Sequence, residues 1–202
     1  MVGVKVTMRI ETDRLIIRDM RPEDDKAYIA MASDGSLDED IFCGCGSNYH
    51  EWMPSWIKGT ILLNEEDNPK KDYLAYTIVE KQQGTVIGSV GCSYFDDLEK
   101  VGLVYFIGAD YRGNGYATEA VVAYTNYFFE HYDISKIIAN IRNENKASCI
   151  TAERAGFKLV ETKMYKDYGD AEERLYNFYE MTKNSKNKGV MPHLQPFQRE
   201  NT

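Results

Sequence analysis

Hydrophobic and polar positions divide the chain into segments whose period changes along its length. Short apolar or β-branched runs bounded by turn residues predict strands. These runs cover residues 14–20, 73–80, 85–94, 101–107, 136–141, 157–165 and 174–181. One segment instead has the spacing of a helix face, because its apolar side chains recur every three or four positions. Its members are Ala117, Ala120, Val121, Tyr124 and Phe128.

Three further helices are predicted. Pro22 and the acids after it favour a helix start, which predicts a helix to about Ala32. Residues 49–64 predict a second helix, and residues 146–155 a third that ends at Gly156. An antiparallel meander therefore precedes alternating strands and helices. This order is typical of a single α+β domain with a mixed, mostly antiparallel sheet.

Composition narrows the class of protein. The 202 residues carry 24 Lys and Arg against 32 Asp and Glu, a net charge of −8. An acidic chain is a poor general binder of nucleic acid. No apolar run reaches the roughly 18 to 20 residues of a membrane span, and residues 1–12 show no signal-peptide core. The four cysteines form no evident disulfide framework, so we expect a cytoplasmic protein.

The chain is long enough for one domain with an appendage. We predict a domain over residues 1–183 and a tail over residues 184–202, which has two prolines and little periodicity. The tail is a candidate contact with a partner subunit. The prediction therefore includes a homodimer.

A glycine-rich turn, RGNGYA at residues 112–117, lies between a predicted strand and a predicted helix. Small residues let a ligand approach the backbone, and the first N–H groups of a helix bind anions. Asn114-Gly115 is also a hairpin signal, and Thr118 stands where a dinucleotide fingerprint needs its third glycine. No Gly-Lys-Ser/Thr follows, which excludes a Walker A loop. An anion-binding loop and a plain structural turn both stay open on spacing alone.

Residues 107–117, IGADYRGNGYA, resemble the acyl-CoA signature R/Q-x-x-G-x-G/A of the GNAT superfamily of N-acetyltransferases. Residues 11–18, ETDRLIIR, resemble the E-T-x-R-L-x-L-R opening of its ribosomal-protein N-terminal acetyltransferase-like branch. Asn145 and Ser148, followed by Gly156-Phe157, resemble the N-x-x-S…G-F segment of that branch. The resemblance covers residues 11–181 and leaves out the tail.

The resemblance implies that acetyl-CoA lies between two splayed parallel strands, at 105–107 and 136–141. It implies a fold with this strand pair at the centre of the sheet and helices on its flanks. The residues implied to bind the cofactor are Phe106, Ile107, Arg112, Gly113, Asn114, Gly115, Tyr116, Ala117, Thr118, Asn145, Ser148 and Arg154.

The resemblance also implies the reaction, direct attack of a primary amine on the thioester in a ternary complex. The acceptor is a protein N-terminus or a small-molecule amine. Many relatives carry a general-acid Tyr where this chain has Ala152, and a Glu where it has Gly102. Ser148 is therefore the candidate hydrogen-bond donor to the thiolate, or only a helix cap, and Glu99 is the candidate base. These departures leave open a non-catalytic acyl-CoA-binding or regulatory module.

Two further groups of residues have competing interpretations. Cys43, Cys45 and His50 supply too few ligands for a structural zinc site, so no metal is expected. Trp52 and Trp56 recur at helical spacing. They form either an aromatic wall for the acceptor or a helix face packed into the core.

Overall fold

The computed structural model describes residues 7–37, 41–42, 47–167 and 169–184. The strands are β1 (Arg9–Glu11), β2 (Leu15–Asp19), β3 (Tyr73–Glu80), β4 (Thr85–Phe95), β5 (Lys100–Ile107), β6 (Lys136–Arg142), β7 (Lys158–Tyr165) and β8 (Arg174–Thr182). The helices are α1 (Asp25–Ala32), α2 (Tyr49–Glu66), α3 (Tyr116–His131) and α4 (Lys146–Arg154), with single 3-10 turns at Pro22–Asp24 and Ala109–Tyr111.

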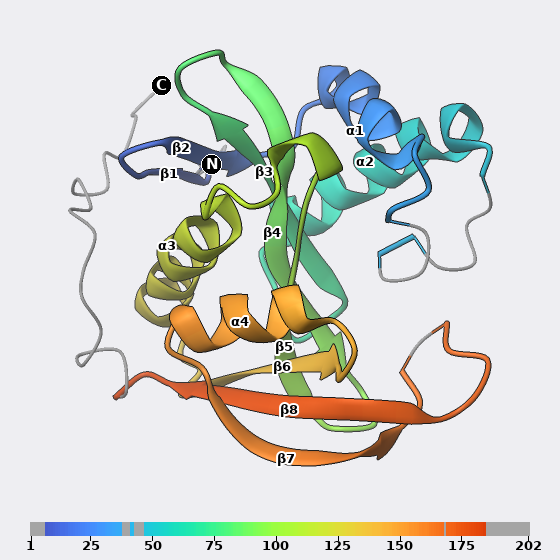
Figure 1. The fold of residues 1–202 in the computed structure, drawn as a ribbon. Helices are drawn as coiled ribbons and strands as arrows, with labels where there is room; N and C mark the ends of the chain where they lie inside the picture. The colour runs from blue at the N-terminus through green and yellow to red at the C-terminus, as the bar shows by residue number, and fades with distance from the viewer. Residues whose placement is uncertain (1–6, 38–40, 43–46, 168, 185–202) are drawn as a thin grey trace.

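Within the described residues, all strands join one sheet in the order β1-β2-β3-β4-β5-β6-β8-β7 (Figure 1). Every neighbouring pair is antiparallel except β5 and β6, which are parallel. The predicted α+β domain with a central parallel pair is confirmed. The division at residue 183 stays a prediction, because residues 185–202 lie outside the described part.

The predicted elements agree with the structure to within about three residues at each end. The sequence pattern missed β1, a three-residue strand that pairs with β2 and carries charged residues at both ends. So short a strand has no alternation to detect, and its pairing with β2 is what makes it a strand.

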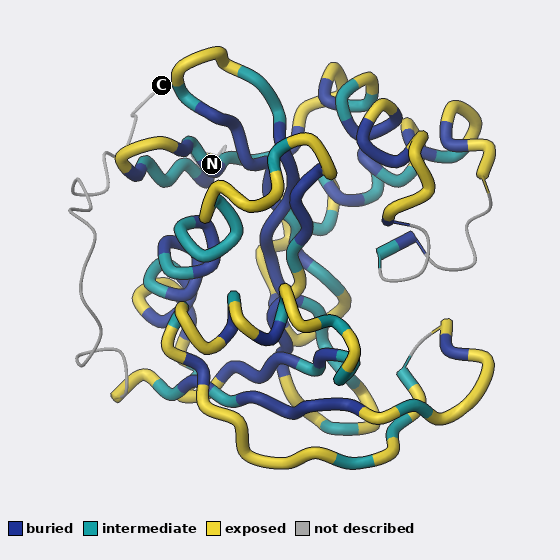
Figure 2. Tube along the Cα trace, in the orientation of Figure 1, coloured by how far each residue is buried: buried dark blue, intermediate teal, exposed yellow. Residues whose placement is uncertain are grey.

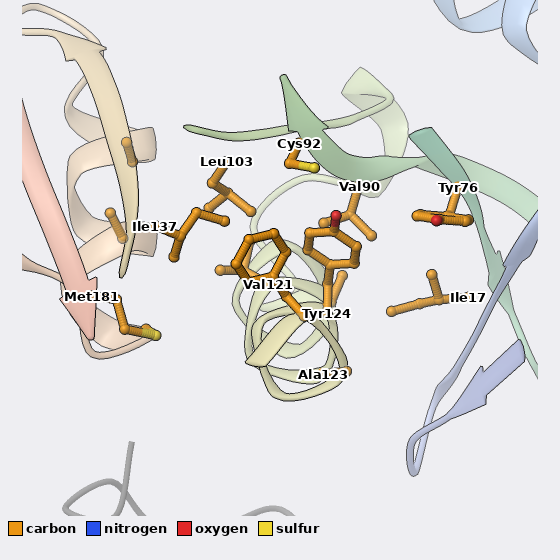
Figure 3. Close-up of a cluster of buried hydrophobic side chains, with 14 of the residues drawn as sticks. Ile17, Tyr76, Val90, Cys92, Leu103, Val121, Ala123, Tyr124, Ile137 and Met181 are labelled. Atoms are coloured by element: carbon orange, nitrogen blue, oxygen red, sulfur yellow. The ribbon is translucent and has the colours of Figure 1, made fainter. Parts of the chain in front are cut away.

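Helices cover the two faces of the sheet unequally. Helices α3 and α4 lie on one face, over the larger hydrophobic core (Figures 1 and 2). Tyr124 and Phe128 of α3 are fully buried in that core, which also contains Val90 of β4 and Ile137 of β6. Figure 3 shows Tyr124 among Val90, Val121 and Cys92. Helices α1 and α2 cover β3 and β4 on the opposite face. The part of that face over β6 and β8 therefore remains uncovered by helix among the described residues.

The aromatic residues of α2 belong to a second, smaller core. Trp52 and Trp56 pack edge-on against Phe42, with ring centroids 5.1 and 5.6 Å apart. Phe42 in turn contacts Phe106 of β5 at 5.7 Å. Of the two interpretations of these tryptophans, the structure supports packing into the core, and it links them to the centre of the sheet through Phe106.

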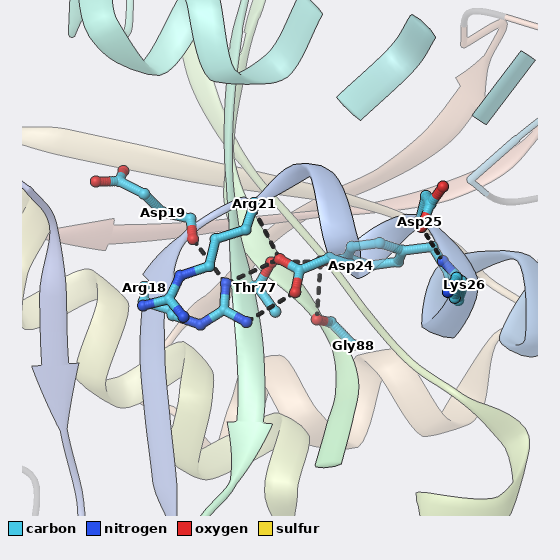
Figure 4. Close-up of polar contacts among 9 residues, drawn as sticks. Arg18, Asp19, Arg21, Asp24, Asp25, Lys26, Thr77 and Gly88 are labelled. Atoms are coloured by element: carbon cyan, nitrogen blue, oxygen red, sulfur yellow. Dashed lines mark hydrogen bonds and ion pairs between the residues drawn. The ribbon is translucent and has the colours of Figure 1, made fainter. Parts of the chain in front are cut away.

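A buried ion pair fastens α1 to the sheet (Figure 4). Arg18 of β2 donates two hydrogen bonds to Asp24, at 2.8 and 2.7 Å. Thr77 of β3 and the Arg21 amide also donate to Asp24, each at 2.9 Å. Burial would raise the pKa of Asp24, but the hydrogen bonds from Arg18, Arg21 and Thr77 outweigh it and lower the pKa.

Asp24→Asn should destabilise the fold by about 3 kcal/mol or more, because it leaves Arg18 buried without its counter-charge. Because the pKa of Asp24 is lower folded than unfolded, its contribution is present above the unfolded value, about 3.9. It is lost as pH falls through the folded value. The measurement is urea unfolding between pH 7 and pH 3. Asp25→Asn, which removes a neighbouring carboxylate outside this ion pair, is the control. Equal stability of the two variants at pH 7 would contradict the prediction.

Candidate active site

The parallel strands β5 and β6 pair at one position, Gly102 with Ile138, and then separate. By contrast, β5 pairs with β4 along its whole length, from Lys100 to Ile107. A cavity of about 680 Å³ opens where β5 and β6 part. The predicted splay of the parallel pair is therefore present in the described strands.

The cavity has walls on both faces of the sheet, because successive strand residues point to opposite sides. We call the two parts the α3/α4 half and the α1/α2 half. The α3/α4 half contains Leu103, Tyr105, Tyr111, Arg112, Gly113, Gly115, Tyr116, Ala117, Thr118, Ala139, Ile141, Asn145, Ser148, Thr151 and Arg154. The α1/α2 half contains Ser36, Leu37, Ile41, Phe95, Val104, Phe106, Asn140, Arg142, Asp167 and Tyr176.

The glycine-rich turn forms a concave rim of the α3/α4 half. Gly113 and Gly115 both have φ of +78°, a conformation that favours glycine. Helix α3 begins at Tyr116, and no described side chain caps it. The first N–H groups of α3 thus lie at the cavity with the positive end of the helix dipole, which suits an anion. A methyl group at Gly113 would meet no described atom within 4 Å, so this rim has room for a ligand.

Arg14 holds this turn from the start of β2. Its guanidinium donates to the Asn114 carbonyl at 2.9 Å and to the Glu119 carboxylate at 2.7 Å. The guanidinium carbon of Arg14 also lies 4.7 Å from the centroid of the Tyr116 ring, a cation–π contact. Thr12 donates to the same carboxylate at 2.6 Å. The opening motif at residues 11–18 therefore acts by fixing the glycine-rich turn, a contact over 100 positions that spacing alone does not reveal.

Arg112 braces the turn from the other side. Its Nε donates to the Ile107 carbonyl at 2.9 Å, and its Nη2 donates to the Ser36 hydroxyl at 3.1 Å. The guanidinium thus links β5 to the segment after α1. The backbone carbonyl of Ile107, one of the residues implied to bind the cofactor, is therefore already engaged by Arg112.

The start of α4 forms the opposite rim. Asn145 Oδ1 accepts a hydrogen bond from the Ser148 amide at 3.1 Å, so Asn145 is the helix cap. Tyr105 of β5 donates to the Ser148 carbonyl at 3.3 Å, and burial raises the pKa of the Tyr105 hydroxyl. Asn145, and not Ser148, therefore caps α4, and Ser148 lines the cavity.

The sequence that forms this site was compared with known protein families. Residues 14–158 match the family described as the acetyltransferase (GNAT) domain. The chain belongs to the GNAT family. Its activity is that of an acetyl-CoA-dependent N-acetyltransferase, with an amine as the acceptor.

Individual relatives are distant. The uncharacterized N-acetyltransferase YnaD of Bacillus subtilis is 26% identical over 159 residues, covering 75% of this chain and 83% of that protein. The uncharacterized N-acetyltransferase p20 of Bacillus licheniformis is 28% identical over 173 residues, covering 83% and 91%. The ribosomal L7/L12 α-N-protein acetyltransferase RimL, solved with coenzyme A, shares the fold. It has a TM-score of 0.74 at 17% identity, covering 88% of this chain and 99% of that one.

The GNAT site brings together almost all of the predicted cofactor-binding residues. The cavity is lined by Phe106, Ile107, Arg112, Gly113, Gly115, Tyr116, Ala117, Thr118, Asn145, Ser148 and Arg154. Asn114 does not line it, and instead its side chain donates to the Tyr111 and Arg112 carbonyls. An uncapped helix start and a glycine turn with room above it fit the pyrophosphate of acetyl-CoA.

Glu99, the predicted base, lies in the turn between β4 and β5 with φ of +50°, is exposed and does not line the cavity. The carboxylates that do line it are Glu144 and Asp167. Where many relatives carry a Glu, a Cβ at Gly102 would lie 2.3 Å from the Phe95 ring, so a side chain there would require Phe95 to move. Sequence reasoning missed Tyr105, Asn140, Glu144 and Asp167. Asn140 had the clearest signal, as a polar residue inside the apolar strand KIIANIR.

Two other expectations concern metal and membrane. Cys43 and Cys45 lie outside the described residues. In the part of the chain that is described, no group of three or more His, Cys, Asp or Glu could hold a metal ion. None of the helices described is long and apolar enough to cross a membrane.

Gly113→Ala should weaken acetyl-CoA binding at least about tenfold, because the new methyl group occupies the rim and strains a positive φ. Gly84→Ala is the matched control. Gly84 also has a positive φ, +68°, with nothing within 4 Å of a Cβ, but it lies in the turn between β3 and β4. Both variants should lose similar stability, about 1 to 2 kcal/mol. Calorimetric titration with acetyl-CoA separates them, and equal affinity of the two variants would contradict the cradle.

Proposed function

We propose that the acceptor amine enters the α1/α2 half of the cavity and attacks the acetyl thioester where β5 and β6 separate. The observation that carries this proposal is the cavity with walls on both faces of one sheet. Its α3/α4 half offers the anion-binding rim, so the acetyl donor belongs there. Its α1/α2 half offers Val104 and Phe106 as apolar walls and no such rim among its described residues.

In this proposal the 112–118 turn holds the pyrophosphate and Asn145 keeps the start of α4 in place. The amine nitrogen forms a bond to the acetyl carbon, the carbon–sulfur bond breaks, and the amine loses a proton. The sulfur leaves as a thiolate, which the Ser148 hydroxyl stabilises by a hydrogen bond. The N–H groups of the 112–118 turn supply binding, so they act mainly on affinity for the donor.

The attacking amine has to be neutral, and a nearby carboxylate can take its proton. A base has to reach the amine within hydrogen-bond distance or through one water. We therefore place the base at Glu144 or Asp167, which line the cavity, ahead of Glu99, which does not. Glu144→Gln, Asp167→Asn and Glu99→Gln, each measured as a pH–rate profile, distinguish the three.

The class of acceptor stays a proposal. RimL is named as a ribosomal α-N-protein acetyltransferase, which supports a protein N-terminus. A small-molecule amine is the second candidate, because the lining of the α1/α2 half is chemically mixed and includes both the apolar Phe95 and the acidic Asp167. A cytoplasmic setting is proposed as well, consistent with the free, buried thiols of Cys92 and Cys149.

The test is calorimetric titration of the full chain with acetyl-CoA, with NADH as the control ligand. Binding of acetyl-CoA alone, followed by thiol release when amines are added, is expected. Binding without transfer to any amine would favour a non-catalytic acyl-CoA-binding module. Absence of binding would overturn the assignment of the donor half.

Ser148→Ala should lower kcat about tenfold or more and leave the KM for acetyl-CoA nearly unchanged, because its hydrogen bond strengthens only as the thiolate forms. Ser93→Ala is the matched control, since Ser93 is also half-buried but lies outside the cavity lining. Steady-state kinetics by thiol release measures both. An unchanged kcat in Ser148→Ala would assign Ser148 a structural role only.

A further inference from the structure

Asn140 of β6 has a buried side-chain amide whose nitrogen and oxygen have no hydrogen-bond partner among the described residues. Buried polar groups in native proteins are nearly always paired, because an unpaired one costs free energy without return. An amide that stays unpaired in the free protein is therefore a candidate ligand contact.

Asn140 lines the cavity, its side chain lies on the α1/α2 side of the sheet, and both amide atoms are closed to solvent in the free protein. Its neighbours Ala139 and Ile141 pack in the core with α3 and α4, so strand alternation turns Asn140 to the opposite face. On that face it pairs with Phe178 of β8 and lines the cavity together with Val104. The amide thus lies away from the anion-binding rim, on the side proposed for the acceptor.

The other buried side chain without a partner among the described residues is Tyr124, through its hydroxyl. Tyr124 lies inside the larger core and does not line the cavity. Like Asn140, Tyr124 has a buried polar atom without a hydrogen-bond partner, but no ligand in the cavity can reach it. Tyr124 therefore serves as a control for the loss of an unpaired buried polar atom.

We propose that Asn140 turns its side-chain amide toward the cavity, binds the acceptor there and selects a primary amine with an oxygen atom on the neighbouring carbon. This inference rests on the proposed function. Its Oδ1 accepts a hydrogen bond from the amine, and its Nδ2 donates one to the oxygen, so both orphan atoms are satisfied by one ligand. Because the amide carries no charge, it orients the amine without stabilising the protonated form as a carboxylate would.

Two kinds of compound share this chemistry: the α-aminoacyl end of a peptide, and a vicinal amino alcohol. Simple alkylamines and polyamines lack the oxygen, so they leave Nδ2 unpaired. Discrimination should follow, because an oxygen-bearing amine gains a hydrogen bond from Nδ2 that an alkylamine cannot form.

The experiment compares alaninamide, 1-amino-2-propanol and propylamine as acceptors for the wild type, Asn140→Leu and Asn140→Ala. Tyr124→Phe is the control variant. The wild type should prefer at least one of the two oxygen-bearing amines over propylamine, and the preferred one identifies the source. Both Asn140 variants should raise the KM for that amine about tenfold and leave the KM for propylamine and the Kd for acetyl-CoA unchanged. Asn140→Leu should also keep or raise the Tm, because it removes an unpaired buried amide.

Tyr124→Phe should keep the acceptor preference of the wild type. The proposal is overturned if the wild type shows no preference for an oxygen-bearing amine, or if the Asn140 variants retain it. Acetyl-CoA binding without transfer to any of the three amines overturns it as well. Failure of acetyl-CoA to bind would instead overturn the proposed function, so the two failures are distinguishable.

Discussion

The structure depends on one interrupted pairing, that between β5 and β6. Strands pair because buried backbone N–H and C=O groups need partners. Here the pairing stops after Gly102 and Ile138, and the Phe95 ring occupies the place of a side chain at that last paired position. Beyond it the sheet is incomplete, and the cavity with walls on both faces is the consequence. The larger core with α3 and α4 joins the two halves of the sheet across this opening, and the smaller core with α1 and α2 packs on the side of β5 alone.

The glycine-rich rim keeps a shape that can bind an anion because side chains from other segments hold it in place. Arg14 and Glu119 hold it from the side of β2, and Arg112 ties it to Ile107 and Ser36. Burial would raise the pKa of Glu119, but its contacts with Thr12 and Arg14 outweigh this and lower the pKa. The carboxylate is therefore ionised at neutral pH, and the turn keeps its shape before a ligand arrives, which reduces the entropy lost on binding.

The sequence predicts what local pattern and motif control. Strand β3 is predicted with its observed bounds, because Tyr73–Glu80 is apolar, β-branched and bounded by turns. The turn at 112–117 is predicted because glycines and a helix start are adjacent in sequence. What the sequence cannot supply is the meeting of distant segments. The Arg14–Glu119 contact spans more than a hundred positions. Glu99 directly precedes β5 in sequence, and yet it does not line the cavity. Asn140 is visible as a polar residue in an apolar strand, but its lack of partners is a property of the fold.

The central claim is that the opening between β5 and β6 holds the donor. Amide hydrogen exchange of the full chain with and without acetyl-CoA tests it most directly. The account predicts slower exchange at residues 103–107, 113–118 and 139–142 when acetyl-CoA is bound, with β1 and β7 unchanged. Slower exchange confined to β1 or β7, or none along β5 and the 113–118 turn, would contradict it.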